Sequence, residues 1–219
     1  YGVMSIPSGI LVEKYGEKKV MVMAFFVSFL GAFFFAWRPS YAGYIFSLFF
    51  IGTGMAMLQV AINPLLRVAG GEKQFAFNSV LGQLFFGLAS FLSPLVYSYI
   101  VVKMELGDGN FISNLFSGIV PAELPWISLY WVFAVVSLLM VFVIGFVKFP
   151  SVERKEDEKV GALTTHLDLL KKPMVILYFF GIFCYVGTEQ GVANWISQFL
   201  QTYHDVDPQT TGANVISLF

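Results

Sequence analysis

The sequence predicts an all-α, polytopic membrane protein, and three observations lead to this fold class. Of its 219 residues, 57% are hydrophobic and 12% are charged, against about 25% charged residues in an ordinary globular protein. Uncharged apolar runs of about 20 residues recur along the chain, and each is long enough to cross a hydrocarbon core of about 30 Å as a helix. The basic residues gather in connections that lie on one side of the membrane.

The uncharged runs divide the chain into helical segments. Five complete membrane spans are expected, near residues 20–37, 44–66, 76–102, 126–149 and 174–200. A helix remnant at 1–12 and an opening helix at 211–219 are cut by the two ends of the sequence. Because the unsatisfied backbone of half a helix is expensive in lipid, we expect the natural protein to continue in both directions.

The distribution of Lys and Arg predicts the orientation of the spans. With residues 13–19 on the inner side, 11 of the 13 basic residues fall in inner connections, and Arg38 and Lys103 are the two in outer ones. Cytoplasmic loops of membrane proteins carry such an excess. The longest charged segment, 150–173, then lies inside, where its position is typical of a linker between two membrane halves.

The polar residues form no pattern typical of nucleic-acid binding, metal binding or catalysis. The formal net charge is −1, which offers no broad cationic face to nucleic acid. Cys184 is the single cysteine, so no internal disulfide or Cys/His metal site is expected. No Ser/His or His/Asp constellation lies beside the spans. We therefore expect no enzyme, no catalytic residue, no metal and no cofactor, while a non-transporting sensor stays open.

The first inner turn combines glycine, acidic and basic residues at a regular spacing. Residues 9–19 read GILVEKYGEKK. Gly9 would let two helices approach closely, Glu13 could cap or pair at a helix end, and Gly16 suits a turn with positive φ. From these properties alone, an ordinary positive-inside turn is an equally good interpretation.

This turn resembles the loop between the second and third helices of the major facilitator superfamily, which has the pattern G-x-x-x-(D/E)-(R/K)-x-G-(R/K)-(R/K)-(R/K). Glu17 stands where that family usually has a basic residue. The other fixed positions match, and the resemblance makes them a gating motif: Gly9, Glu13, Lys14, Gly16, Lys18 and Lys19.

The resemblance also implies a domain organisation. The chain would run from the end of helix 2 to the start of helix 8 of an expected twelve, a partial helical bundle. Residues 1–149 would belong to the N-terminal six-helix half, 150–173 would form the cytoplasmic linker between the halves, and 174–219 would begin the C-terminal half.

Three further stretches resemble fucose permease and related sugar/cation symporters. Residues 58–64, LQVAINP, are similar to the L-(E/Q)-x-A-x-N-P stretch of that family, and residues 185–189, YVGTE, to its YVG-x-E segment. Residues 83–90, QLFFGLAS, resemble its N/Q-x-F-x-G-x-G/A-S segment. In acidic family members a carboxylate important to transport occupies the position of Gln59, so this step of coupling differs here.

The symporter resemblance implies a function. We expect a monomeric, multi-pass protein of the plasma or bacterial inner membrane that moves a monosaccharide, such as fucose, glucose or galactose, by cation-coupled symport with alternating access. Its partners would be the sugar and the lipid bilayer. The alternative is a drug or metabolite efflux antiporter of the same fold.

Glu189 is the one acidic residue inside a predicted span. A carboxyl group at that depth is protonated, paired or exposed to a water-filled cavity. This placement favours a role in coupling transport to H⁺ or Na⁺. The alternative is a neutral acid that is hydrogen-bonded between helices.

A polar stripe follows on the same span. Gln190, Asn194, Ser197 and Gln201 recur at helical spacing. Glu189 lies about 100° round the helix from this stripe, so the two share a cavity if that cavity is wide or if the helix loosens at Gly187 or Gly191. Gln190 and Asn194 are candidates for binding sugar, and Trp195 could stack on a pyranose ring. Interhelical hydrogen bonding by the amides, at about 0.6–2 kcal/mol each, and membrane anchoring by Trp195 are the alternatives.

Three more amide side chains lie in earlier spans. Gln59 and Asn63 are four residues apart and share a helix face, and Gln83 lies in the next span. Amides present both donors and acceptors, which suits sugar hydroxyls. We therefore predict that Gln59, Asn63 and Gln83 bind substrate, although Asn63-Pro64 could instead mark a helix kink.

Overall fold

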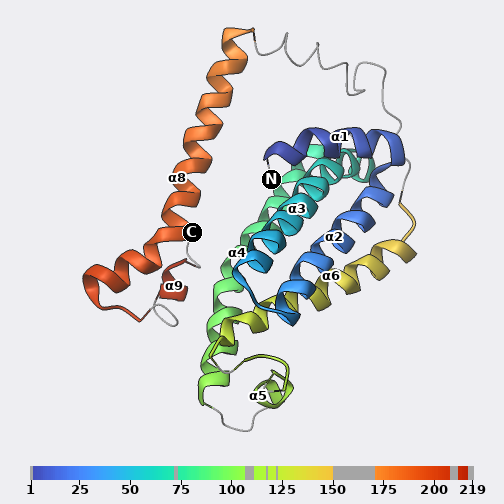
Figure 1. Cartoon of the computed structure of the whole chain (residues 1–219). Coiled ribbons are helices and arrows are strands. Elements are labelled where there is room, and N and C mark those ends of the chain that lie inside the picture. Colours follow the sequence, from blue (N-terminus) through green and yellow to red (C-terminus); the bar gives the residue numbers. More distant parts are fainter. Residues whose placement is uncertain are drawn as a thin grey trace. The chain divides into compact units, whose positions relative to one another are not determined.

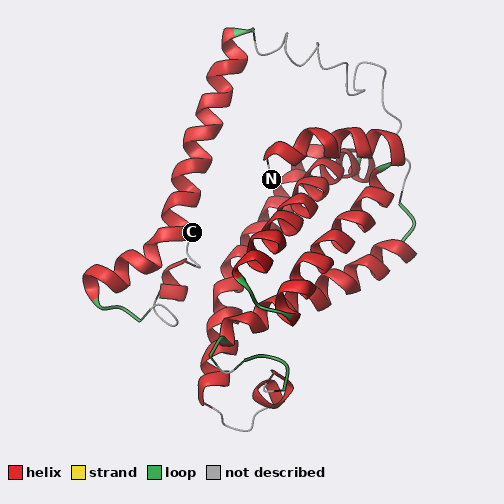
Figure 2. Cartoon of the chain, in the orientation of Figure 1, coloured by secondary structure: helices red, strands yellow, loops and turns green. Residues whose placement is uncertain are grey.

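The computed structural model describes residues 2–71, 74–106, 111–116, 118–121, 123–149, 171–207 and 212–216. These parts of the chain are helices and their connections, without strands (Figure 2). Five helices among them are long and apolar enough to cross a membrane. The all-α fold class and the five predicted spans are therefore confirmed. The linker predicted at 150–173 falls outside the described residues except at its end.

Four of the five membrane helices extend beyond the predicted spans, because polar residues at the edge of an apolar run still continue the hydrogen-bonded ladder of the helix. The span predicted at 126–149 is the exception: its helix ends at Phe146, three residues early. The elements labelled in Figure 1 are α1 (Gly2–Tyr15), α2 (Glu17–Trp37), α3 (Tyr41–Gly70), α4 (Phe75–Leu106), α5 (Phe111–Phe116), α6 (Ser128–Phe146), α8 (Pro173–His204) and α9 (Ala213–Ile216). The 3-10 turn η2 (Pro125–Ile127) precedes α6.

The chain divides into two compact units. The first comprises Tyr1–Gln83 and Lys103–Val160, and the second comprises Leu84–Val102 and Gly161–Phe219. In the first unit, α2 packs against both α3 and α6, and α1 packs against α3. In the second unit, α8 packs against α9.

Small residues bring α2 and α3 into backbone contact. A Cβ atom on Gly54 would collide with the Ser28 side chain and would lie 2.7 Å from the carbonyl oxygen of Ala24. A Cβ atom on Gly31 would lie 2.8 Å from Cβ of Phe50. Helices in membranes associate through such small residues, because there is no hydrophobic driving force between them in lipid.

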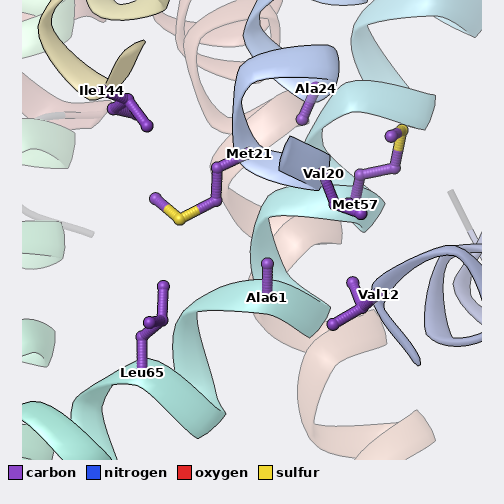
Figure 3. Packing of buried hydrophobic residues seen from close by; sticks show 8 residues of the cluster. All are labelled: Val12, Val20, Met21, Ala24, Met57, Ala61, Leu65 and Ile144. Atoms are coloured by element: carbon purple, nitrogen blue, oxygen red, sulfur yellow. The ribbon is translucent and has the colours of Figure 1, made fainter. Parts of the chain in front are cut away.

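A buried apolar cluster joins α1, α2, α3 and α6 beside the first inner turn. Its residues are Val12, Val20, Met21, Ala24, Met57, Ala61, Leu65 and Ile144 (Figure 3). Val12 and Val20 flank the turn between α1 and α2, so they anchor both of its ends. The predicted gating motif therefore stands on a packed base rather than in a free loop.

Candidate functional site

Gln59 and Asn63 lie on an exposed face of α3, as their spacing predicts. The opposite side of the same stretch is buried at Met57 and Ala61, and Ala56, one turn before Gln59, is buried as well. α3 continues through Pro64 to Gly70, so the proline does not end the helix. Because the packed side of α3 holds the helix in place, the two amides are presented together on its open side.

Gln83 of α4 is also exposed, and α4 approaches α3 beside it. A methyl group placed on Gly82 would lie 3.8 Å from Cδ1 of Leu66. Leu66 follows Asn63 by three residues and therefore lies on the same side of α3. This contact places Gly82, the residue before Gln83, beside α3 about one turn beyond Asn63.

Glu189 is half-buried on α8 and is held by a neighbour on the same helix. The hydroxyl group of Tyr185 is hydrogen-bonded to its carboxyl group. Because the two residues are four apart on one helix, this hydrogen bond favours one orientation of the acid. This role of Tyr185 was not predicted from the sequence, although a separation of four residues on a helix is a signal for such a pair.

The remaining polar residues of α8 are partly engaged within the helix itself. Asn194 Nδ2 donates to the carbonyl oxygen of Gln190 at 2.8 Å. Asn194 and Gln190 therefore share a face, as predicted, and Asn194 keeps its amide oxygen and one further donor for another partner. The side chain of Gln190 is exposed, as is that of Trp195.

α8 runs as one continuous helix from Pro173 to His204. It stays helical at Gly187 and Gly191. Loosening at these glycines was one way for Glu189 to share a cavity with the polar stripe, and this loosening is absent from α8. Its second half nevertheless turns away from the axis of its first half (Figure 1). Within the described residues, no group of three His, Cys, Asp or Glu side chains could hold a metal ion.

The inner turn is fixed by backbone geometry and by one long-range contact. Gly16 has φ of 81°, which confirms the predicted positive-φ position. Lys18 Nζ donates to the carbonyl oxygen of Gly145 at 2.8 Å, near the end of α6. The sequence did not predict this partner. The remaining members of the motif are partly or fully exposed: Gly9, Glu13, Lys14 and Lys19.

Comparison with known proteins matches the whole chain to one family. The family described as Major Facilitator Superfamily matches residues 1–219. The chain is 26% identical over 215 residues to a putative glucose/galactose transporter of Helicobacter pylori, covering 96% of this chain and 51% of that protein. It is 26% identical over 219 residues to a glucose/galactose transporter of Brucella abortus, covering 97% and 48% respectively.

A third relative and a solved structure are also similar to this chain. The chain is 25% identical over 218 residues to the L-fucose-proton symporter of Escherichia coli, covering 91% of this chain and 48% of that protein. The crystal structure of a variant of the E. coli fucose:proton symporter FucP superposes with a TM-score of 0.64 at 23% identity, covering 90% of this chain and 51% of that one. The chain therefore spans about half the length of the relatives that it matches.

Proposed function

Because the chain belongs to the Major Facilitator Superfamily, we propose that the full-length protein is a secondary active transporter of monosaccharides. The chain is a multi-pass integral membrane protein. Its relatives named as glucose/galactose transporters and as an L-fucose-proton symporter support a sugar as the substrate. Since these relatives are bacterial, the inner membrane is the expected location.

The observation that carries the proposal is the hydrogen-bonded carboxyl group inside a membrane span. Glu189 is half-buried, and Tyr185 holds it from one turn earlier on α8. Ionisable groups within spans mark ion and proton pathways. We assign proton coupling to Glu189: it takes up a proton on the side with the higher proton activity and releases it on the other side. Net uptake of sugar then follows the proton gradient.

Sugar binding is assigned to the amides and to one aromatic ring. Gln59, Asn63 and Gln83 of the first unit are exposed, and so are Gln190 and Asn194 of the second. Each amide can donate to one sugar hydroxyl while accepting from another. The exposed ring of Trp195 offers a face for stacking on a pyranose.

Alternating access makes the coupling work. The transporter would open to one side at a time, as carriers built from two helical halves do when one half rocks against the other. Sugar and proton bind together from outside and leave together inside. When Glu189 is protonated, its side chain is neutral, so the carrier passes through the occluded state more easily than with a charged carboxylate.

The test is uptake by vesicles that carry the full-length protein. Labelled fucose, glucose and galactose are supplied under an imposed proton gradient, an imposed sodium gradient, or neither. We expect accumulation of at least one sugar under the proton gradient. Glu189→Gln should abolish accumulation while exchange of labelled for unlabelled sugar continues, because exchange needs no net proton movement.

A matched control separates coupling from general damage. Glu123→Gln neutralises an exposed acid outside the spans and should leave accumulation unchanged. If accumulation follows the sodium gradient instead, Na⁺ replaces H⁺ as the coupling ion in this proposal. If no sugar moves under either gradient, the sugar assignment fails and an efflux carrier of the same fold becomes the better interpretation.

A further inference from the structure

An aromatic pocket of about 480 Å³ lies in the first unit, apart from the exposed amides of α3. It sits where α2 ends, α3 begins and α6 begins, at the connections that the basic residues place on the outer side of the membrane. Its lining consists mainly of aromatic side chains, together with one serine: Phe35, Tyr41, Tyr44, Trp126, Tyr130 and Ser40. Pro39 and Leu124 complete it.

Local hydrogen bonds hold the walls of this pocket. Ser40 caps α3, where its Oγ accepts a hydrogen bond of 3.1 Å from the backbone N–H of Gly43. On the other side, Ile127 is fully buried, and Ser128 Oγ donates to the carbonyl oxygen of Pro125 at 2.6 Å. The aromatic residue between these anchors, Trp126, is therefore carried by a fixed 3-10 turn.

The rings are also fixed relative to one another. Phe35 is 3% exposed and forms the floor of the pocket. Its ring centroid lies 4.6 Å from that of Tyr130, 5.6 Å from that of Tyr44 and 5.8 Å from that of Trp126. Trp126 and Tyr130 meet edge to face at 6.1 Å. Such contacts between rings contribute about 0.5–1.5 kcal/mol each beyond the area that they bury.

The chemistry of the lining limits the ligand. None of the eight lining residues carries a charge, which disfavours an anionic headgroup or a phosphate because these require Arg or Lys. Aromatic faces with phenol hydroxyls at their edges match a ring that has apolar C–H faces and polar edges. The volume lies within the range of about 300–1,000 Å³ that is usual for small-molecule sites.

We propose that this pocket is a peripheral carbohydrate site on the outer side of the membrane, which binds a neutral pyranose. The choice of a sugar rests on the proposed function, since the transported substrate is the pyranose expected outside the cell. This pocket would bind the sugar in addition to the transport site, and it would raise the amount of sugar held at the outer side of the protein. Its loss should therefore affect uptake at low sugar concentration and leave the maximal rate intact.

The test measures sugar binding and transport separately on the purified full-length protein. Binding of glucose, galactose and fucose is followed by saturation-transfer NMR, in Asn63→Ala to weaken the transport site. With the sugar titrated, we expect the affinity of the residual binding to fall about tenfold, equivalent to about 1.4 kcal/mol, when Trp126→Leu or Tyr130→Phe is added. Trp131→Phe, also on α6 but not in the lining, is the matched control and should retain the signal.

Transport supplies the second readout. In vesicles, Tyr130→Phe should raise KM for sugar uptake with kcat unchanged. Tyr130→Phe removes one hydroxyl group, so it also tests the pocket if Trp126→Leu fails to fold. If transport occurs and the residual binding is indifferent to both substitutions, the rings are membrane anchors only and this proposal is wrong while the proposed function stands. If the pocket binds sugar but no sugar is transported, the proposed function fails instead.

Discussion

Lys18 Nζ donates a 2.8 Å hydrogen bond to the carbonyl oxygen of Gly145 and so ties the turn between α1 and α2 to the end of α6. The last carbonyl groups of a helix have no partner within the helix, and a positive charge beside them is stabilised by the helix dipole. Since α6 ends at Phe146, the contact lies where the chain leaves its fourth complete span.

Replacing Lys18 by Met should therefore lower stability slightly. Both the hydrogen bond and the favourable charge at the helix end are lost, which is worth about 0.3–1 kcal/mol at an exposed position. Thermal unfolding of the detergent-purified protein would measure the change. Lys19→Met removes the same charge one residue later, at an exposed side chain, and equal effects of the two substitutions would argue against the α6 contact.

Tyr185→Phe should impair proton-driven uptake. The substitution keeps the ring and removes the hydroxyl group that holds Glu189. Without this hydrogen bond Glu189 is no longer held in one orientation, so the initial rate of proton-driven accumulation should fall. Exchange of sugar without a gradient should continue. Tyr178→Phe, at another exposed tyrosine of α8, is the control, and a similar loss there would contradict a specific role for Tyr185.

Asn63→Ala should weaken sugar binding with little effect on stability. Its side chain is exposed on α3, so the truncation opens no cavity in the packed bundle, but one hydrogen bond to the sugar worth about 1 kcal/mol is lost. The KM for sugar exchange should rise about fivefold or more. Ile62→Ala shortens the adjacent exposed side chain without removing a hydrogen-bonding group, and it should leave KM unchanged. An unchanged KM in Asn63→Ala would remove this residue from the binding site.

Gly54→Ala should destabilise the α2–α3 pair. The added methyl group would meet Ser28 and the backbone carbonyl of Ala24, and overpacking of this kind costs about 1–3 kcal/mol. Gly181→Ala on α8, where nothing lies within 4 Å of the new methyl group, is the control. Comparison of the two melting temperatures in detergent checks the prediction, and equal values would show that α2 and α3 can separate without penalty.

The membrane spans could be predicted from the sequence because lipid imposes one local rule, a continuous apolar run that satisfies its own backbone. The common face of Gln59 and Asn63 and the turn at Gly16 follow from equally local rules, helical spacing and the φ preference of glycine. These features depend on neighbours within a few residues along the chain.

The contacts that give the candidate site its detail depend on packing instead. The partner of Lys18 lies 127 residues away in sequence, and no local rule points to Gly145. The aromatic pocket combines side chains from α2, α3, η2 and α6. In the sequence alone, aromatic residues near span ends resemble ordinary interfacial anchors. The hydrogen bond between Tyr185 and Glu189 is intermediate between local and packing-dependent features. Their spacing on the helix permits it, but the side-chain rotamers of both residues determine whether it forms.

The close approach of α2 and α3 at Gly31 and Gly54 has a consequence for experiments on the transport cycle. Two helices that touch at their backbones move as one body, because any sliding would drive Ser28 into α3 or Phe50 into α2. A pair of spectroscopic probes on their outer ends should report the same separation in every state of the carrier. That pair can serve as an internal ruler against which distance changes elsewhere in the molecule are calibrated.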